Sequence, residues 1–376
     1  MARLVRLVER HSHRQRQIVE AVRGQIVSGQ LAPGARVPSI NELAAAHQAS
    51  TKTALTALTY LQEHGFIISR RGSGSFVSET PPHLSQFALV FQDAPRRDGS
   101  WSQFFMAWKR EAKRLVAPGC EGSRCGRRFS FIYLDLHVAG TPAERELQSA
   151  MEADLFAGLI FPDYPSFLHG AEILADRRTP KVCVAQQPKE GFTTLVLDNA
   201  LPEKALNCLA GHGRRRAAFL VPSFLDSDSP ILATDYLVRL AADCGLTSYR
   251  HWVQGIDITS PRWAANWTEF LCRCGPERPD ALFISDDNLV PSATQGLLNA
   301  GIRVPDDIEV VAHCNFPYPT PSLVPARRIG FDVRHLLHLS VDTIERQRRG
   351  EAVPDTLCVH SHFDDELPYS APGTES

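Results

Sequence analysis

The sequence predicts an α/β protein in which a small basic head precedes a larger body of two parallel-sheet subdomains. Three observations support this prediction. The first 65 residues show helical apolar periodicity, short apolar strand-like runs alternate with helical stretches after residue 87, and the two parts differ in charge. A chain of 376 residues is long enough for two or three domains.

The charge of the chain changes sign between head and body. Residues 1–80 contain ten Lys and Arg residues against five Glu residues, a net charge of +5. The whole chain carries a net charge of −2, so residues 81–376 carry −7. A basic segment on an acidic body indicates that the head meets a polyanion and the body does not.

Composition also argues against a membrane protein and a secreted protein. The longest apolar runs fall far short of the ~20 residues that a membrane-spanning helix needs. Residues 1–13 are interrupted by Arg and Glu and lack the apolar stretch of a signal peptide. Nine cysteines, an odd number without zinc-site spacing, favour reduced thiols. We therefore expect a cytoplasmic protein with no metal and no cofactor.

The head begins with two predicted helices. The first covers 14–29, and its apolar residues recur at i, i+4 and i+8 on one face: Ile18, Val22 and Ile26. The turn signal Pro33-Gly34 follows. Ser39, with Glu42 three residues later, forms a capping box that opens a short second helix over 40–48.

A third helix and a hairpin complete the head. Ser50 is the predicted N-cap of a helix over 51–65, for which we expect a core stripe of Leu55, Leu58 and Leu61. Two β-rich runs then surround the turn Gly72-Ser73-Gly74, which is typical of a hairpin. Three helices and a hairpin in about 65 residues form a winged helix-turn-helix, a DNA-binding fold.

The predicted DNA contacts follow from this fold. The third helix fits the major groove and presents its first residues to base edges. The hairpin, or wing, carries arginines that reach phosphates or the minor groove. The predicted contacts are Arg14, Arg36, Ser39, Ser50, Thr51, Lys52, Thr53, Arg70, Arg71, Gly72 and Gly74. The alternative is that these charges are merely solvated on a small helical domain.

Residues 24–77 resemble the GntR family of bacterial transcription regulators. The matching motifs are G-x-L-x-P-G-x-R-V-P-S, the following E-L-A, and the wing R-x-G-S-G-x-F-V. Three departures concern residues that face DNA in that family. Thr51 replaces an Arg, Leu55 or Thr56 replaces a second Arg, and Ser39-Ile40-Asn41 replaces the S-E-R/S-R-R start of the preceding helix. The resemblance therefore implies DNA binding with a base preference of its own.

The body, residues 87–366, follows a linker over 78–86 and precedes a flexible tail over 367–376. Its strands are predicted at 87–92, 129–134, 157–161, 181–185, 193–197, 216–221, 249–254, 281–285 and 308–312. Its helices are predicted at 101–116, 142–153, 165–176, 202–211, 231–244, 263–273, 288–300 and 332–349. Such alternation indicates doubly wound parallel sheets, whose ligands bind outside the carboxyl ends of the strands.

The body resembles the ligand-binding domain of the LacI/GalR regulators, which is periplasmic-binding-protein-like and has two subdomains. The motifs lie in 279–315, 193–199, 211–221 and 327–354. Two departures concern ligand contacts. No Arg stands near Ala233, and Cys314 or Asn315 replaces an Asp. The resemblance implies a small effector, most simply a sugar or sugar derivative, in an altered site.

Polar residues that follow the predicted strands are the candidate ligand contacts. They are Asp135, His137, Asp163, Tyr164, Asp198, Asp286 and Asn315. For each, the alternative is a local role as a turn residue or a helix cap. Trp252 also lies near a strand, where a place in the core competes with stacking on a sugar.

Catalytic motifs are absent from the sequence: it has no G-x-S-x-G, no phosphate-loop motif and no H-E-x-x-H. The expected protein is therefore not an enzyme. It is a homodimeric repressor that binds a double-stranded DNA operator in the nucleoid and responds to a small ligand. The alternative is a regulator without an effector, whose body serves only as a dimerisation scaffold.

Overall fold

The computed structural model describes residues 12–97, 101–120, 122, 125–138, 140–223, 234–273 and 278–367. The chain forms two compact units. Unit 1 comprises Met1–Ala94, Ala112–Thr194 and Leu339–Thr356, and unit 2 comprises Pro95–Glu111, Leu195–His338 and Leu357–Ser376. The amino-terminal head is thus part of unit 1.

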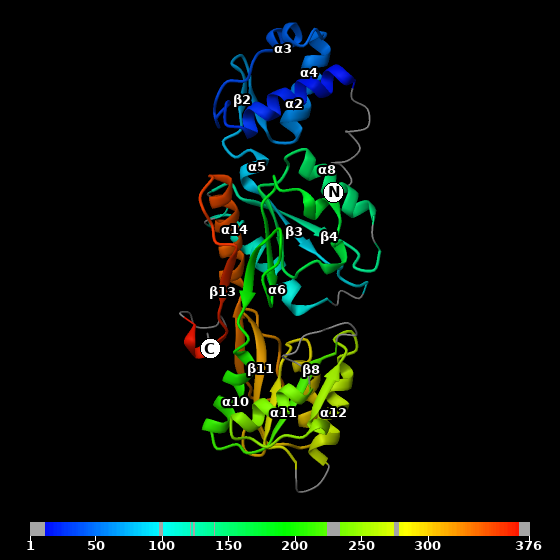
Figure 1. Ribbon diagram of the computed structural model, residues 1–376, viewed down its shortest axis with the longest axis vertical. Helices are drawn as coiled ribbons and strands as arrows, with labels where there is room; N and C mark the ends of the chain where they lie inside the picture. Colours follow the sequence, from blue (N-terminus) through cyan, green and yellow to red (C-terminus); the bar gives the residue numbers. More distant parts are fainter. Residues whose placement is uncertain are drawn as a thin grey trace. The chain divides into compact units, whose positions relative to one another are not determined.

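The head, blue in Figure 1, is a winged helix-turn-helix, as predicted. Its elements are α2 (His13–Val27), α3 (Ile40–Ala46), α4 (Thr51–Glu63), β1 (Ile67–Arg70) and β2 (Gly74–Val77). The two strands pair antiparallel, with Arg70 opposite Gly74. Gly72 and Gly74 have positive φ angles of 75° and 103°, which glycine adopts without a steric penalty. The helices and hairpin enclose one apolar core that includes Ile18, Val22, Ile26, Leu58 and Leu61.

The prediction that Leu55 belongs to this core is wrong. Its side chain is 52% exposed, whereas Ala54, Ala57, Leu58 and Leu61 are buried. A helix turns about 100° per residue, so the residue after Ala54 leaves the buried face. The spacing of the leucines alone predicted the wrong buried face of α4, because alanines occupy part of the face that is buried.

The segment predicted as a linker, 78–86, contains the short helix α5 (Pro82–Ser85). Pro82 and His83 are buried, and His83 stacks on Phe66 of the head with ring centroids 6.2 Å apart. Arg23 of α2 also pairs with Asp154, which follows α8, at 3.2 Å from Nε to Oδ2. The head is therefore packed against the rest of unit 1.

The first of two six-stranded sheets has the order β13-β7-β6-β5-β3-β4. β3 pairs parallel with β4 and β5, and β5 pairs parallel with β6. The strands are β3 (Gln86–Phe91), β4 (Arg128–Tyr133), β5 (Gly158–Phe161), β6 (Lys181–Ala185), β7 (Thr193–Leu197) and β13 (Thr356–Val359). Helix α8 (Pro142–Glu152) belongs to unit 1, whereas α6 (Gln103–Leu115) and α14 (Val333–Arg348) each contribute residues to both units.

The second sheet, in unit 2, has the order β14-β12-β11-β10-β8-β9. Its pairs are parallel except β12–β14. The strands are β8 (Ala217–Pro222), β9 (Val253–Ile256), β10 (Ala281–Ile284), β11 (Glu309–Phe316), β12 (Arg327–Asp332) and β14 (His362–Phe363). The helices are α10 (Leu201–Gly211), α11 (Thr234–Asp243), α12 (Arg262–Arg273) and α13 (Val290–Asn299).

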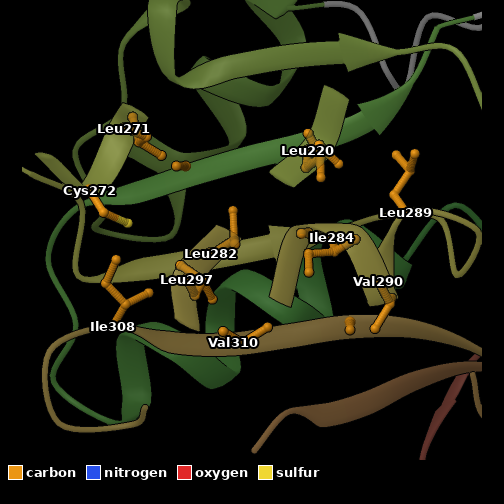
Figure 2. Packing of buried hydrophobic residues seen from close by; sticks show 14 of the residues in the cluster. Leu220, Leu271, Cys272, Leu282, Ile284, Leu289, Val290, Leu297, Ile308 and Val310 are labelled. Atoms are coloured by element: carbon orange, nitrogen blue, oxygen red, sulfur yellow. The ribbon is translucent and has the colours of Figure 1, made fainter. Parts of the chain in front are cut away.

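Unit 2 has an apolar core on the face of its sheet that α12 and α13 cover. Figure 2 shows Leu220, Leu282 and Ile284 of the strands beside Leu271 of α12 and Leu297 of α13. The two helices approach closely at Gly296, where a Cβ atom would collide with the carbonyl oxygen of Ala265. Trp252 is buried in this core. Of the two roles considered for it, the structure shows the place in the core and not an exposed ring on which a sugar could stack.

The doubly wound α/β architecture is confirmed, with local differences. The helix predicted over 165–176 is instead a 3₁₀ turn (Ser166–Leu168) and the short α9 (Glu172–Ala175), separated by Gly170 with φ 82°. The strand predicted over 249–254 begins as a 3₁₀ turn (Arg250–Trp252). Strands β12, β13 and β14 were not predicted. The start of the helix predicted over 231–244, with Ala233, and most of the tail lie outside the described residues.

In the part of the chain that the structure describes, no helix is both long and apolar enough to cross a membrane.

Candidate functional site

The helix-turn-helix of the head is stabilised by serines at the start of both its helices. Ser50 Oγ accepts a hydrogen bond from Thr53 N at 3.1 Å and lies 2.8 Å from Thr53 Oγ1. Ser39 Oγ accepts from Glu42 N at 3.3 Å, while Ser39 N donates to Glu42 Oε2 at 2.7 Å. The bond from Ser39 N lowers the pKa of Glu42. These caps leave Thr51 and Lys52 exposed at the start of α4.

The predicted basic contacts surround the wing and the helix-turn-helix. Arg36, Arg70 and Arg71 are exposed. The Arg70 guanidinium lies over the Phe76 ring, 4.8 Å from its centroid, and Arg36 forms a β-bridge with Phe76. Arg14 donates to the carbonyl oxygen of Gln48, between α3 and α4. We call Arg14, Arg36, Lys52, Arg70 and Arg71 the basic surface of the head.

In unit 1, polar side chains meet where the strand order of the sheet reverses, between β3 and β5. The amide Nε2 of Gln92, after β3, donates to Asp163 Oδ2 at 2.7 Å. Tyr164 N donates to Asp163 Oδ1 at 2.9 Å, and Lys189 Nζ lies 4.6 Å from the Tyr164 ring centroid. Such reversal points are where open α/β sheets bind ligands. The sequence placed Asp163 and Tyr164 here but not Gln92 or Lys189.

Asp135 and His137 lie in the turn that follows β4, at the edge of the same sheet. Both side chains are exposed, and Asp135 Oδ1 accepts a hydrogen bond from His137 N at 3.0 Å. This contact is the local turn role that competed with ligand binding in the sequence analysis.

In unit 2, a buried polar cluster is formed by residues after β10, near the end of β11 and at the start of β12. Asp287 and Asn315 are each 1% exposed, and Asn315 Nδ2 donates to Asp287 Oδ2 at 2.6 Å. His313 Nδ1 lies 4.0 Å from Asp287 Oδ1. Arg328 of β12 is also buried and donates from Nη2 to the Thr320 carbonyl at 2.7 Å. We call Asp287, His313, Asn315 and Arg328 the polar cluster of unit 2.

This polar cluster has hydrogen-bonding capacity to spare. Within the described residues, Asn315 Oδ1, His313 Nδ1, Arg328 Nη1 and Ser285 Oγ are buried without a hydrogen-bond partner. Burial raises the pKa of Asp287 and lowers that of His313, and the negative charge of Asp286 raises the pKa of Asp287 further. Buried donors and acceptors without partners cost free energy, so such a group favours a hydrogen-bonding ligand or water.

Two other predicted ligand carboxylates already accept hydrogen bonds from the protein itself. Asp286 Oδ1 accepts from both N and Nδ2 of Asn288, each at 2.8 Å. Asp198 Oδ1 accepts from Ser361 Oγ at 2.9 Å, and its Oδ2 accepts from Ser361 N at 3.1 Å. Asp198 thereby ties the end of β7 to the segment after β13. Asp286 makes a turn contact but does not cap α13, whose N-cap is Leu289, and Asp198 contacts a residue far away in the sequence, so it forms neither a local turn nor a helix cap.

Sequence reasoning missed Arg328 and did not choose Asp287 over Asp286. Arg328 lies in the segment 327–331, which was not predicted as a strand and whose two arginines gave no sign that one of them would be buried. Glu111 was also missed: it is fully buried and accepts a hydrogen bond from Tyr318 Oη at 2.8 Å. Among the described residues, no group of three or more His, Cys, Asp or Glu side chains is arranged to hold a metal ion.

Two family matches cover the head and much of the body. Residues 14–77 match the bacterial regulatory proteins of the gntR family. Residues 206–359 match the periplasmic binding protein-like domain.

Similar proteins include transcription regulators. The chain is 22% identical to an arabinose metabolism transcriptional repressor of Geobacillus stearothermophilus, over 82% of this chain and 84% of the relative. It resembles the structure of a LacI family regulator from Lactobacillus casei with bound glucose, with 19% identity and a TM-score of 0.55 over 74% of this chain and 98% of the other. A LacI family regulator from Arthrobacter sp. FB24 in complex with lactose has 16% identity and a TM-score of 0.56, over 74% and 97% of the two chains. The chain is thus a DNA-binding transcription regulator with a GntR-type helix-turn-helix domain and a periplasmic-binding-protein-like domain.

Proposed function

We propose that the protein is a homodimeric repressor of a near-palindromic operator, controlled by a carbohydrate that binds its body. The head of each chain would bind one half-site, so that the symmetry of the dimer matches that of the DNA. This role places the protein in the cytoplasm, on the nucleoid. Catalysis has no part in it.

The observation that carries the effector proposal is the polar cluster of unit 2. It brings together amide and imidazole groups of β11, the guanidinium of β12 and the carboxyl group after β10, and several of its buried polar atoms have no hydrogen-bond partner among the described residues. Sugar hydroxyls both donate and accept hydrogen bonds, so they suit such a mixed set. Two structural neighbours have glucose and lactose bound. In unit 1, Asp163 and Tyr164 are the proposed contacts.

Control of DNA binding follows from linkage. A sugar that binds one conformation of the body more tightly shifts the protein towards that conformation. If the two conformations hold the heads differently, the sugar changes DNA affinity, and DNA changes sugar affinity by the same factor. A coupling of roughly 1–3 kcal/mol, typical of allosteric proteins, is enough.

A panel of sugars, sugar phosphates and sugar acids tests this proposal by thermal shift. A ligand at 100 times its Kd adds about 2.7 kcal/mol to stability, which raises the melting temperature measurably. Asp287→Asn is expected to remove the shift, because it replaces an oxygen that accepts hydrogen bonds. Asp306→Asn makes the same chemical change at an exposed carboxyl of unit 2 and is expected to keep the shift. A shift that survives Asp287→Asn removes the polar cluster from the proposal.

The second candidate function is a regulator with no effector, whose body is a dimerisation scaffold. The observation in its favour is that the carboxylates of Asp135, Asp198 and Asp286 accept hydrogen bonds from their own surroundings. Under this proposal no member of the panel changes the melting temperature, while DNA binding and dimer formation persist. A single sugar that raises the melting temperature eliminates it.

A further inference from the structure

The outward face of the recognition helix α4 carries an exposed apolar residue among threonines, although the surface around it is basic. Leu55 is 52% exposed at the centre of this face. Thr51, Lys52, Thr56 and Thr59 are exposed beside it. Lys52 is the one basic residue of α4, and the helix contains no arginine.

Hydrogen bonds within the helix make this face still less polar. Thr56 Oγ1 donates to the Lys52 carbonyl at 2.9 Å, and Thr59 Oγ1 donates to the Leu55 carbonyl at 3.0 Å. Thr53 Oγ1 is engaged by Ser50 Oγ. With their hydroxyl groups turned to the backbone, Thr56 and Thr59 offer methyl groups beside the Leu55 side chain.

The chemistry of the major groove identifies what such a face can read. Guanine is read best by the fork of an arginine, and adenine by the amide of Asn or Gln. Apolar side chains read the 5-methyl group of thymine. The basic surface of the head can hold the phosphates on either side without reading bases.

We propose that α4 recognises its half-site through thymine 5-methyl groups, which pack on Leu55 and on the methyl groups of Thr56 and Thr59. Lys52 and the wing arginines supply affinity that does not depend on sequence. This inference rests on the proposed DNA-binding function and names the chemistry by which one operator is chosen over another.

Deoxyuridine provides the test, because it differs from thymidine only by the missing methyl group. Preferred duplexes are first selected from a random library with the full-length protein. Each thymine of the selected duplex is then replaced singly by deoxyuridine, and Kd is measured at fixed salt. Burial of one methyl group contributes about 0.8 kcal/mol, so roughly a fourfold loss is expected at the contacted thymines.

Two variants assign the effect to Leu55. Leu55→Ala removes an exposed side chain, so the fold is expected to persist; its Kd should no longer distinguish thymine from uracil at those positions. Lys52→Ala, the matched control on the same turn, should weaken all duplexes alike and keep the fourfold difference. Leu55→Arg should move the selected base from thymine towards guanine.

The outcomes separate this inference from the proposed function. Selection that yields no preferred sequence overturns both. A preferred sequence whose Kd is unaffected by deoxyuridine overturns the methyl readout, and an equal effect in the wild type and in Leu55→Ala overturns the role of Leu55; both outcomes leave the proposed regulator intact.

Discussion

At the scale of a single residue, Asp287 shows how the polar cluster of unit 2 differs from polar side chains on the protein surface. Its carboxyl is buried, receives one hydrogen bond from Asn315 and has Asp286 as its neighbour. Burial and the charge of Asp286 together raise its pKa, so the folded protein holds a proton that the unfolded chain releases. Such an arrangement costs stability and is typical of functional sites.

The free energy of unfolding should therefore depend on pH through Asp287. An unfolded Asp has a pKa of about 3.9, so stability falls as the pH rises from there towards the raised folded-state pKa. Asp287→Asn should remove this loss and stabilise the protein by roughly 1–3 kcal/mol at pH 8, because one pKa unit corresponds to about 1.4 kcal/mol. Urea unfolding at pH 5 and pH 8 measures it, with Asp306→Asn as control. The same pH dependence in both variants would show that Asp287 is ionised in the folded state.

At the scale of elements, apolar periodicity predicted most helices and strands because their buried faces repeat regularly. The predicted buried face of α4 was wrong because Ala54 and Ala57, not Leu55, belong to the core of the head. The prediction of one helix over 165–176 was wrong because Gly170 adopts a left-handed conformation, which interrupts the helix. β13 and β14 are short strands at the edges of the sheets. They form because they pair with a neighbouring strand, and a short stretch of sequence does not show this pairing.

The revised phase of α4 makes a prediction about stability. Ala57→Leu inserts a larger side chain into a fully buried position and should cost about 1–3 kcal/mol. Leu55→Ala, only two residues away, should change stability by less than about 0.5 kcal/mol because Leu55 is exposed. Thermal unfolding of both variants decides this. A larger loss of stability for Leu55→Ala than for Ala57→Leu would show that the Leu55 side chain belongs to the core, as the sequence analysis predicted.

The wing makes a prediction about DNA binding. Arg70→Ala and Arg71→Ala together should weaken binding to every sequence and reduce the slope of log K against log salt concentration by about 2, roughly one unit for each phosphate that an arginine no longer neutralises. Binding measured from 50 to 200 mM salt gives the slope. Leu55→Ala serves as the control, since an uncharged residue should leave the slope unchanged. If the slope of the double variant is that of the wild type, the wing does not contact phosphates.

At the scale of the whole molecule, the sequence predicted a winged helix-turn-helix followed by two parallel-sheet subdomains, whereas the order of the strands and the contacts of the candidate ligand residues appear only in the structure. The motifs in residues 24–77 and 279–315 indicate the fold, because they contain turn residues and the apolar residues of buried strands. The contacts of Asp286 with Asn288, and of Asp287 with Asn315, depend on which way adjacent side chains turn after β10. The neighbouring strands determine the direction of these two side chains, so a local sequence pattern could not predict it.

The central claim is that a small ligand in the body controls DNA affinity, and one measurement tests it most directly. The Kd for the selected duplex is measured with and without the sugar that raises the melting temperature. We predict a change of about 5- to 150-fold, absent in Asp287→Asn and retained in Asp306→Asn. An unchanged Kd at a saturating concentration of that sugar would contradict allosteric control.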